Sequence, residues 1–289
     1  MLASLYVGLR LAHFMALMLA GGIVLYGAWW AASPLRRLIL CRFRLLLTVS
    51  LGVSAVTATL MLMVQGGLMG DGWQDVPRPS LWLAVAGTRF GSVWVWQILL
   101  AWVALLTAVL RPQRSAALLL TLCVAQFVLL AGVGHAAMHD GLLGAAQRLN
   151  HAVHLLCAAA WFGGLLPFLY CLRLAKGAWR KAAIFSMMRF SRYGHLAVAG
   201  VIATGIANAL FIQGTLFSDG AYGRLLVVKC ALVALMVVIA LLNRYVLVPR
   251  LSRTQTWAAR GFVRTTQAEL VLGALVLALV SLFATWEPF

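Results

Sequence analysis

Acidic residues are scarce in this sequence. Only 6 Asp and Glu stand against 23 Lys and Arg among 289 residues, which leaves a formal net charge of +17. Carboxylates are too few for a hydrolase of the usual kind, and no Ser/His/Asp arrangement stands out. A G-x-x-x-x-G-K-[ST] phosphate loop, a phosphorylation-type aspartate motif and a soluble nucleotide domain are also missing, which argues against ATP-driven pumping by this chain. We therefore expect a protein that is not an enzyme.

The cysteines and the basic residues each argue against a further class of protein. The 5 cysteines are scattered without a C-x-x-C pair, so we expect no disulfide framework. The positive charge could suggest nucleic acid, but 20 of the 23 basic residues are Arg, and most lie in short connections between apolar runs. This pattern is typical of membrane topology. We expect no nucleic-acid partner, no internal repeat and no separate soluble domain.

Apolar residues dominate what remains. They make up 64% of the chain, far more than a soluble domain can bury, so lipid must solvate it. Lipid offers the backbone no hydrogen-bond partners, so long apolar runs must be helical. The sequence predicts an all-α, polytopic bundle in a single transmembrane domain over residues 1–289, with about eight spans. These are Leu5–Ala31, Leu45–Gly67, Gly91–Leu110, Ala116–Met138, Arg148–Leu172, Phe190–Ile212, Tyr222–Val246 and Thr265–Trp286.

The basic residues predict the orientation, because Lys and Arg are retained on the cytoplasmic side. The odd-numbered connections hold 17 of the 23: Arg36, Arg37, Arg42, Arg44, Arg111, Arg114, Arg173, Lys176, Arg180, Lys181, Arg189, Arg192, Arg244, Arg250, Arg253, Arg260 and Arg264. All acids but Glu269 fall elsewhere, at Asp71, Asp75, Asp140, Asp219 and Glu287. We therefore expect both termini to be periplasmic. The first segment lacks a basic n-region and a cleavage site, and it is expected to be a retained helix.

Two further patterns concern packing. The longest outer connection, Gly66–Phe90, is rich in Gly, Pro and Trp, and we expect an ordered loop at the membrane interface. Small residues recur on the fifth and sixth predicted helices, including Gly163-Gly164 and Gly200, where helices must approach closely. Both helices are therefore predicted to be central in the bundle.

Histidines gather near the predicted outer surface. His135 and His139 end the fourth predicted helix, and His151 and His154 open the fifth after a short loop. The i, i+4 and i, i+3 spacings place each pair on one helix face, so the two helix ends could converge as a four-imidazole cage. Imidazole and thioether together suit copper. The candidate metal ligands are His13, His135, His139, His151, His154, Met15, Met18 and Met138.

Each of these residues also has a structural interpretation. A lone membrane histidine often hydrogen-bonds a neighbouring helix, and methionines at helical spacing often only pack. Further polar residues are predicted along a path through the membrane: His195, Asn208, Lys229, Asn243 and Glu269. Glu269 lies about one turn into the last predicted helix. It either pairs with His195, as a proton relay or metal site, or forms a salt link with Arg244 or Arg264; Lys229 either faces Asn208 or snorkels.

Several stretches resemble the copper resistance protein D (CopD) family. They are HAVHLLCAAAWFGGLLPF (151–168), RFSRYGHLAVAGVIATGIANA (189–209), YGRLLVVKCALVALMVVIALLNRYVLVP (222–249) and, in the first helix, RLAHFMALMLAGG (10–22). The resemblance implies an inner-membrane protein of copper handling, often beside a small periplasmic copper-binding protein of the CopC type. It favours His13, His151, His154, Trp161, Asn208, Lys229, Asn243, Arg244 and Glu269, whereas His135 and His139 rest on their spacing.

These observations lead to one hypothesis and two rivals. The leading hypothesis is copper transport across the bacterial inner membrane, from periplasm to cytoplasm, with the outer His/Met cluster as the site of capture. A haem b redox protein with histidine axial ligands is the first alternative, since histidines on adjacent helices can also clamp haem. The second is an assembly or sensor protein that binds copper without moving it. The oxidation state of copper, the direction of its movement, the driving force and the oligomeric state are left open by the sequence.

Overall fold

The chain is helical throughout the part that the computed structural model describes, which comprises residues 1–110, 115–216, 219–251 and 256–286. No strand occurs in those segments. The long helices are α1 (Leu2–Leu25), α3 (Arg44–Met69), α5 (Arg89–Leu110), α7 (Gly141–Leu174), α8 (Arg180–Gln213), α9 (Ala221–Leu242) and α11 (Thr256–Phe283). The shorter elements are η1 (Tyr26–Trp30), α2 (Ser33–Arg42), η2 (Trp73–Asp75), α4 (Pro79–Ala86), α6 (Ala116–Leu130), η3 (Gly134–Ala137), η4 (Asn243–Leu247) and α10 (Val248–Leu251).

Seven of the described helices are long and apolar enough to cross a bilayer. An α-helix satisfies the hydrogen bonds of its interior backbone groups within its own segment, and lipid offers these groups no other partners. The prediction of an all-α, polytopic bundle is therefore confirmed. The chain is a multi-pass membrane protein.

The fourth predicted span is shorter than expected. Helix α6 ends at Leu130 after 15 residues, a length of about 22 Å, against a hydrocarbon core of about 30 Å. Glycines interrupt the chain beyond it, and Gly134 has a φ of 71°, a left-handed conformation that favours glycine. His135 then lies in the 3₁₀-helix η3, and His139 follows it outside any helix. The prediction that these two histidines share a helix face is therefore wrong.

Three other helices begin well before their predicted first residues, and one of them, α8, begins at Arg180 instead of Phe190. Helix α7 begins at Gly141 and not at Arg148, because the apolar and small residues between them extend the helix. His151 and His154 do not open this helix, since His151 lies ten residues in, about 15 Å along the axis. Helix α11 begins at Thr256, so Glu269 lies near the middle of that helix and not one turn from its end.

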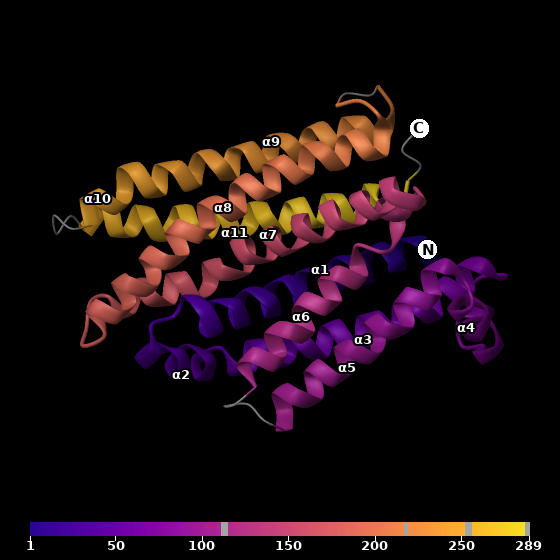
Figure 1. Ribbon diagram of the computed structural model, residues 1–289, viewed down its shortest axis with the longest axis horizontal. Coiled ribbons are helices and arrows are strands. Elements are labelled where there is room, and N and C mark those ends of the chain that lie inside the picture. Colours follow the sequence, from indigo (N-terminus) through magenta and orange to yellow (C-terminus); the bar gives the residue numbers. More distant parts are fainter. Residues whose placement is uncertain (111–114, 217–218, 252–255, 287–289) are drawn as a thin grey trace.

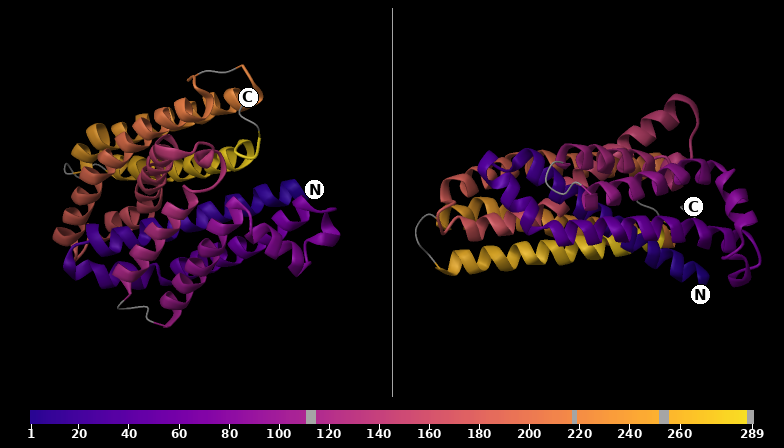
Figure 2. Two further views of the ribbon diagram at one scale, coloured as in Figure 1. Left: turned by 45° about the vertical axis from the view of Figure 1, so that its right-hand side comes forward. Right: turned by 90° about the horizontal axis from the view of Figure 1, so that it is seen from below.

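Helices α1 and α7 form the centre of the bundle. In Figure 1 they run between α3 and α5 on one side and α9 and α11 on the other, and the left view of Figure 2 keeps this order. In their most apolar stretches, 61% of the residues of α1 and of α7 are buried, but only 17% of those of α8. The prediction of a central position thus holds for α7 and is wrong for α8, which packs against α7 at the periphery.

The hydrophobic core has two main parts, one on each side of this centre. One joins α1 to α3, α5 and α6 around Leu17, Trp94 and Phe127. The other joins η1 and α2 to α7, α8 and α11 around Tyr26, Phe168 and Phe262. Helix α7 contributes to both parts, since its Leu155 and Phe162 pack in the first and its Phe168 in the second, so it couples the two sides of the bundle.

The loop between α3 and α5 is ordered, as its composition predicts. Asp75 is buried, accepts a hydrogen bond from the backbone N–H of Asp71 at 2.6 Å and forms an ion pair with Arg78 at 2.6 Å. The indole of Trp82, on α4, donates to the carbonyl of Val76 at 2.7 Å. The bends before α4 are therefore held by specific contacts.

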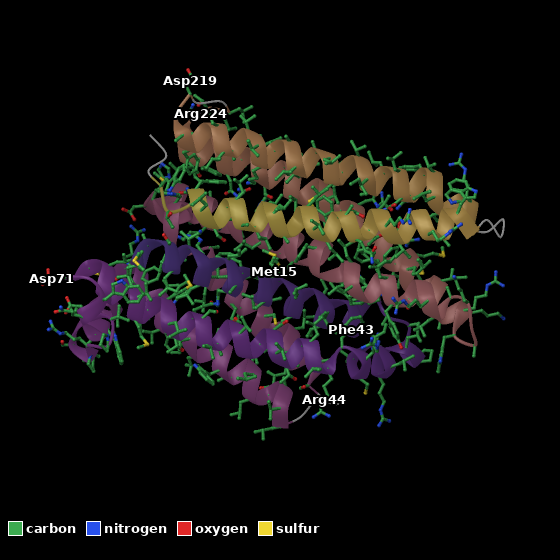
Figure 3. All side chains as sticks on the ribbon, turned by 180° about the vertical axis from the view of Figure 1, so that it is seen from behind. Met15, Phe43, Arg44, Asp71, Asp219 and Arg224 are labelled. Carbon is green, nitrogen blue, oxygen red and sulfur yellow. The ribbon has the colours of Figure 1, made fainter. Side chains whose placement is uncertain are left out.

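Residues near the start of α1 and residues just after α11 lie at the same end of the bundle. Ala3 and Tyr6 near the start of α1 line the same pocket as Ala284, Thr285 and Trp286 after α11. Asp71, Asp219 and Arg224 lie at this end in Figure 3, and Arg44 lies toward the other. Among the residues that predict the orientation, Arg111, Arg114, Arg253 and Glu287 lie outside the described residues. The periplasmic placement of the termini stays a prediction.

Candidate functional site

His13 is fully buried between α1, α3 and α5, and both its ring nitrogens are in use. Nδ1 lies 3.0 Å from the carbonyl oxygen of Ser54 and 3.2 Å from Oγ1 of Thr57. A carbonyl only accepts, so Nδ1 carries the proton. Nε2 then accepts from the side-chain amide of Gln97 at 3.1 Å, and the same amide donates to Oε1 of Gln126 at 3.4 Å. The imidazole joins α1 to α3 and α5, and Gln97 extends the network to α6, so neither ring nitrogen has a lone pair free for a metal.

His151 and His154 lie beside each other on the face of α7 that meets α8. Their rings are nearly parallel, with planes 10° apart and centroids 6.2 Å apart. Nδ1 of His151 lies 3.2 Å from Nδ2 of Asn208, and Nδ1 of His154 lies 2.9 Å from Oγ1 of Thr204. The predicted pairing of these two histidines is therefore present, with partners from α8.

The hydrogen bonds distinguish the two rings. Asn150 donates through Nδ2 both to the carbonyl of Thr204 and to Oδ1 of Asn208, each at 3.0 Å. Nδ2 of Asn208 must then donate to His151, whose Nδ1 is an acceptor and whose proton sits on Nε2. The hydroxyl of Thr204 donates to the carbonyl of Gly200 and accepts from His154. Nε2 of His154 is thus an unprotonated nitrogen with its ring oriented by a second group, as in metal-ligating histidines.

Lys229 of α9 approaches the same two histidines. It lies near enough for its positive charge to act on both His151 and His154. Asn208, which also belongs to the predicted path, contacts the site directly. The structure therefore gathers Asn208 and Lys229 around the histidine pair.

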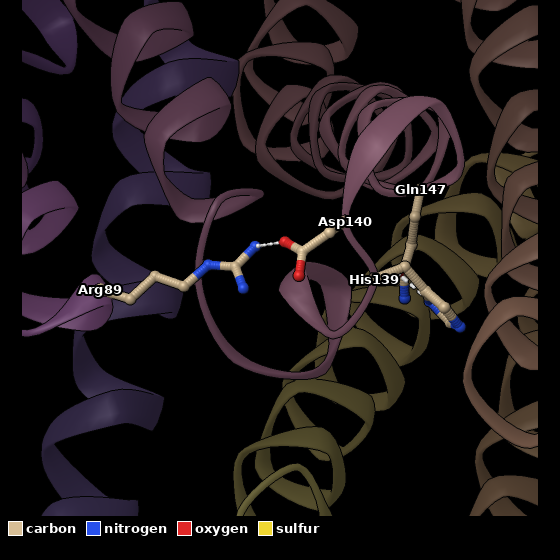
Figure 4. A network of polar contacts seen from close by, with 4 residues as sticks. All are labelled: Arg89, His139, Asp140 and Gln147. Carbon is tan, nitrogen blue, oxygen red and sulfur yellow. Dashed lines mark hydrogen bonds and ion pairs between the residues drawn. The ribbon is translucent and has the colours of Figure 1, made fainter.

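His135 and His139 lie in the segment between α6 and α7, and Gln147 bonds to both of them; Figure 4 shows its contact with His139. Nδ1 of His139 lies 2.8 Å from Oε1 of Gln147, and Nε2 of Gln147 donates to the carbonyl of His135 at 2.8 Å. Since Oε1 accepts, His139 carries its proton on Nδ1 and leaves Nε2 free. The neighbouring Asp140 pairs with Arg89 of α5 at 2.8 Å.

His135 faces the other way, toward the chain ends. Its ring packs edge-on against Tyr222 at 5.8 Å, and the backbone of Trp286 hydrogen-bonds the imidazole. Nε2 of His135 is buried and has no hydrogen-bond partner. Burial, opposed by the Trp286 hydrogen bond and assisted by the charge of Arg10, lowers the pKa of His135 below its usual 6.5. A neutral imidazole with a free nitrogen is the form that binds metals.

The methionines differ in their surroundings. Met18 is buried in the core between α1 and its neighbours, and Met15 packs against the same core. Met138 is 39% exposed, in the loop that carries His135 and His139. Packing accounts for the first two, whereas Met138 is accessible from solvent.

A second polar group lies deeper, around Glu269. Nδ2 of Asn243, in the π-helix η4, donates to Oε2 of Glu269 at 2.9 Å, and the side chain of Trp161 also hydrogen-bonds this carboxyl group. Oδ1 of Asn243 accepts from the hydroxyl of Thr265. Glu269 is only 2% exposed. Its partners are all neutral, which is an unusual environment for a carboxylate at membrane depth.

His195 and Arg244 form a separate pair. Nη1 of Arg244 lies 2.9 Å from Nδ1 of His195 and 2.9 Å from Oγ of Ser191. A guanidinium only donates, whereas the carbonyl oxygen of Ser191, which also lies beside Nδ1 of His195, only accepts, so these contacts do not assign the proton of this ring. In the described part of the chain the ion pairs are Arg78–Asp75 and Arg89–Asp140. Neither the pairing of Glu269 with His195 nor a salt link of Glu269 with Arg244 or Arg264 forms there.

The predicted four-imidazole cage is not assembled in this structure. No group of three or more His, Cys, Asp or Glu side chains within the described segments is close enough to hold a metal ion. His13 belongs to the α1/α3/α5 side, His151 and His154 to the α7/α8 interface, and His135 and His139 to the loop. Any ion that uses them must meet them in succession.

Sequence reasoning missed several amides and a hydroxyl that position these histidines: Gln97, Gln126, Gln147, Asn150 and Thr204. A signal was present for the first two, because a glutamine inside an apolar run is costly without a partner. The partners of a side chain depend on the rotation of each helix, which hydropathy does not determine.

Comparison with known proteins agrees with the sequence and the fold. The family described as "Copper resistance protein D-like, N-terminal domain" matches residues 1–145, and "Copper resistance protein D" matches residues 184–283. The "Inner membrane protein YebZ" of Escherichia coli (strain K12) is 52% identical over 290 residues, covering 100% of both chains. The "Copper resistance protein D" of Pseudomonas syringae pv. tomato is 29% identical over 305 residues, covering 98% of this chain and 97% of that one.

No solved structure matches the chain at a significant level. The relatives nevertheless align over essentially the whole chain, and the helices are those of a multi-pass inner-membrane protein. The chain belongs to the copper resistance protein D family.

Proposed function

We propose that this protein carries copper ions across the bacterial inner membrane, from the periplasm to the cytoplasm, and that it catalyses no covalent chemistry. Its family is named for copper resistance, and copper here is the cargo. The observation that carries the proposal is the state of His154: a ring held by Thr204 at the α7/α8 interface with Nε2 left free. Such a nitrogen suits either oxidation state of copper.

The outer loop supports a capture step. His135 and His139 each keep Nε2 free, and Met138 between them adds a thioether. Thioethers favour Cu(I), whereas imidazole binds both states. A CopC-type periplasmic copper-binding protein is the donor that the family resemblance suggests. It would release copper to this exposed loop, from which the ion passes to His154.

The deeper polar groups support an inward route. Below the histidine pair, Glu269 and its neutral partners line the α7/α9/α11 contact, and His195 lies on α8 beside Arg244. Polar side chains at this depth are costly and mark ion or proton pathways in membrane proteins. A carboxylate without a cation partner can receive a copper ion or a proton, and either would neutralise it.

Copper uptake into proteoliposomes tests the proposal. His154→Ala alone, and His151→Ala with His154→Ala, should reduce uptake at least tenfold, because the free nitrogen is lost. Thr121→Ala is the matched control, since this exposed hydroxyl bonds only to Ala117 of its own helix. Unchanged uptake by the double variant would remove the proposed path.

The optical spectrum of the purified protein separates transport from the redox alternative. A copper carrier has no Soret absorption, whereas near-stoichiometric haem would give a Soret band that disappears in the His151 and His154 variants. Bound copper without any uptake by the wild-type protein would favour an assembly or sensor role.

A further inference from the structure

The end of the bundle that carries both termini contains a pocket of about 460 Å³. Tyr6 and Arg10 of α1, Gln65 of α3, and Thr285 and Trp286 after α11 contribute polar groups to its lining. The pocket opens to the outside and is separate from the Nε2 atom of His154. A volume of this size accommodates a small organic ion.

Arg10 is the charged residue of this pocket. Its Nε is buried and has no hydrogen-bond partner, and its guanidinium lies 5.4 Å from the ring of Phe14. Neither ion pair in the described segments involves Arg10. An arginine keeps its charge under all ordinary conditions and presents five N–H donors in a planar fork. A buried donor without a partner is uncommon in a folded protein and calls for a ligand.

The other polar groups fit the same ligand. Tyr6 and Gln65 line the same pocket as Arg10, and their phenol and amide groups can each donate a hydrogen bond. The charge of Arg10 also acts on His13, His135 and His151, and that of Lys229 acts on His151 and His154. Two cations therefore border the histidines of the proposed copper path, where they would repel a bare copper ion unless an anion accompanied it.

We infer that this pocket binds an oxyanion, a carboxylate or phosphate group held by the guanidinium of Arg10 with help from Tyr6 and Gln65. A planar carboxylate or a phosphate matches the fork of arginine with paired N–H···O bonds. The anion can arrive as a soluble carboxylate, including a copper chelate, or as the phosphate of a lipid headgroup. Binding of the anion does not depend on copper transport, but it would neutralise the outer end of the path.

Titration of the intact protein without copper tests this inference. The protein is placed in nanodiscs of neutral phosphatidylcholine and titrated with citrate and, separately, with inorganic phosphate, by calorimetry. A third sample uses nanodiscs that contain phosphatidylglycerol. Saturable binding of citrate or phosphate identifies a soluble anion. If citrate binds in phosphatidylcholine nanodiscs but not in those with phosphatidylglycerol, the phosphate of the lipid headgroup competes for the same pocket.

Variants locate the site. Arg10→Gln should weaken binding by about tenfold to a hundredfold, as expected for loss of a charged hydrogen-bond donor. Tyr6→Phe keeps the charge and should weaken it only a fewfold. Arg224→Gln is the matched control, an exposed arginine at the same end of the bundle and outside the pocket.

These measurements test anion binding in the pocket and are independent of copper transport. Failure of the wild-type protein to bind citrate, phosphate or phosphatidylglycerol overturns the inference, as does equal binding by the Arg10→Gln and Arg224→Gln variants. If Arg10→Gln does not elute as a folded protein, Arg10→Lys replaces it and should bind several times more weakly than wild type. Because copper is left out, loss of copper uptake in other variants does not bear on the result.

Discussion

Gly22 of α1 and Gly163 of α7 meet backbone to backbone. A Cβ atom built on Gly22 would lie 2.3 Å from the Cα of Gly163, far inside van der Waals contact. Close approach of this kind is how small residues join helices in membranes, where no hydrophobic force drives them together. The two central helices are therefore locked at one crossing point, and both sides of the bundle depend on it.

Gly22→Ala should destabilise the protein. The added methyl group has only backbone to displace, so overpacking is expected to cost about 1–3 kcal/mol. Unfolding in a detergent titration measures this difference. Gly8→Ala on the same helix is the control, since nothing lies within 4 Å of its Cβ position, and it should be neutral or stabilising. Equal effects of the two substitutions would contradict the proposed crossing.

His13→Ala should reduce stability without reducing copper binding. The substitution leaves one of the two N–H groups of the buried Gln97 amide without an acceptor, which is expected to cost about 1–3 kcal/mol. A double-mutant cycle with Gln97→Leu should reveal a coupling energy of about 1 kcal/mol, because the two side chains are in direct contact. Copper titration of the same variants provides the second measurement. A large loss of bound copper in His13→Ala would show that His13 is a copper ligand.

The contrast between His13 and His154 illustrates what the sequence can and cannot predict. Span number and helical type follow from hydropathy, because lipid forces every long apolar run to satisfy its own backbone. Helix ends are less predictable. Helix α7 begins at Gly141, and the mixed apolar and polar composition of its first residues does not distinguish a helix from a loop. Which histidine has a free nitrogen depends on Ser54, Gln97 and Thr204 from other helices. That information appears only when the helices are packed.

Glu269→Gln should separate stability from transport. The amide still offers an oxygen to Asn243 and Trp161 and removes an uncompensated charge, so the free energy of unfolding should change by less than about 1 kcal/mol. Copper uptake should fall strongly, because an amide neither binds a cation well nor carries a proton. Glu269→Ala, in contrast, leaves two buried donors unpaired and should be unstable. Normal uptake by Glu269→Gln would exclude the carboxylate from the path.

Gln147→Leu should loosen the outer loop. Gln147 accepts from His139 and donates to the carbonyl of His135, so its loss frees both ends of the segment. Loss of such a supporting partner typically lowers metal affinity roughly 10- to 100-fold. Hydrogen exchange of residues 132–140 should accelerate in parallel. Arg89→Gln is the control: it breaks an exposed ion pair to Asp140 in the same loop and should have little effect, since exposed pairs contribute about 0–1 kcal/mol.

His135 should make the stability of the protein depend on pH in mildly acidic solution. Burial holds its pKa in the folded protein below 6.5, the usual value that the unfolded chain regains. Below that value His135 binds a proton more readily in the unfolded chain than in the folded protein. Proton binding therefore stabilises the unfolded state, and the free energy of unfolding falls as the pH decreases. Thermal unfolding of the wild type between pH 7.5 and 5, in steps of about half a unit across the range in which histidine titrates, measures the fall. His135→Gln should have a shallower fall over the same range, and Met138→Leu, a substitution in the same loop without a titratable group, should follow the wild type. Parallel curves for all three proteins would show that His135 titrates alike in the folded and unfolded chain, which its buried, unpartnered Nε2 argues against.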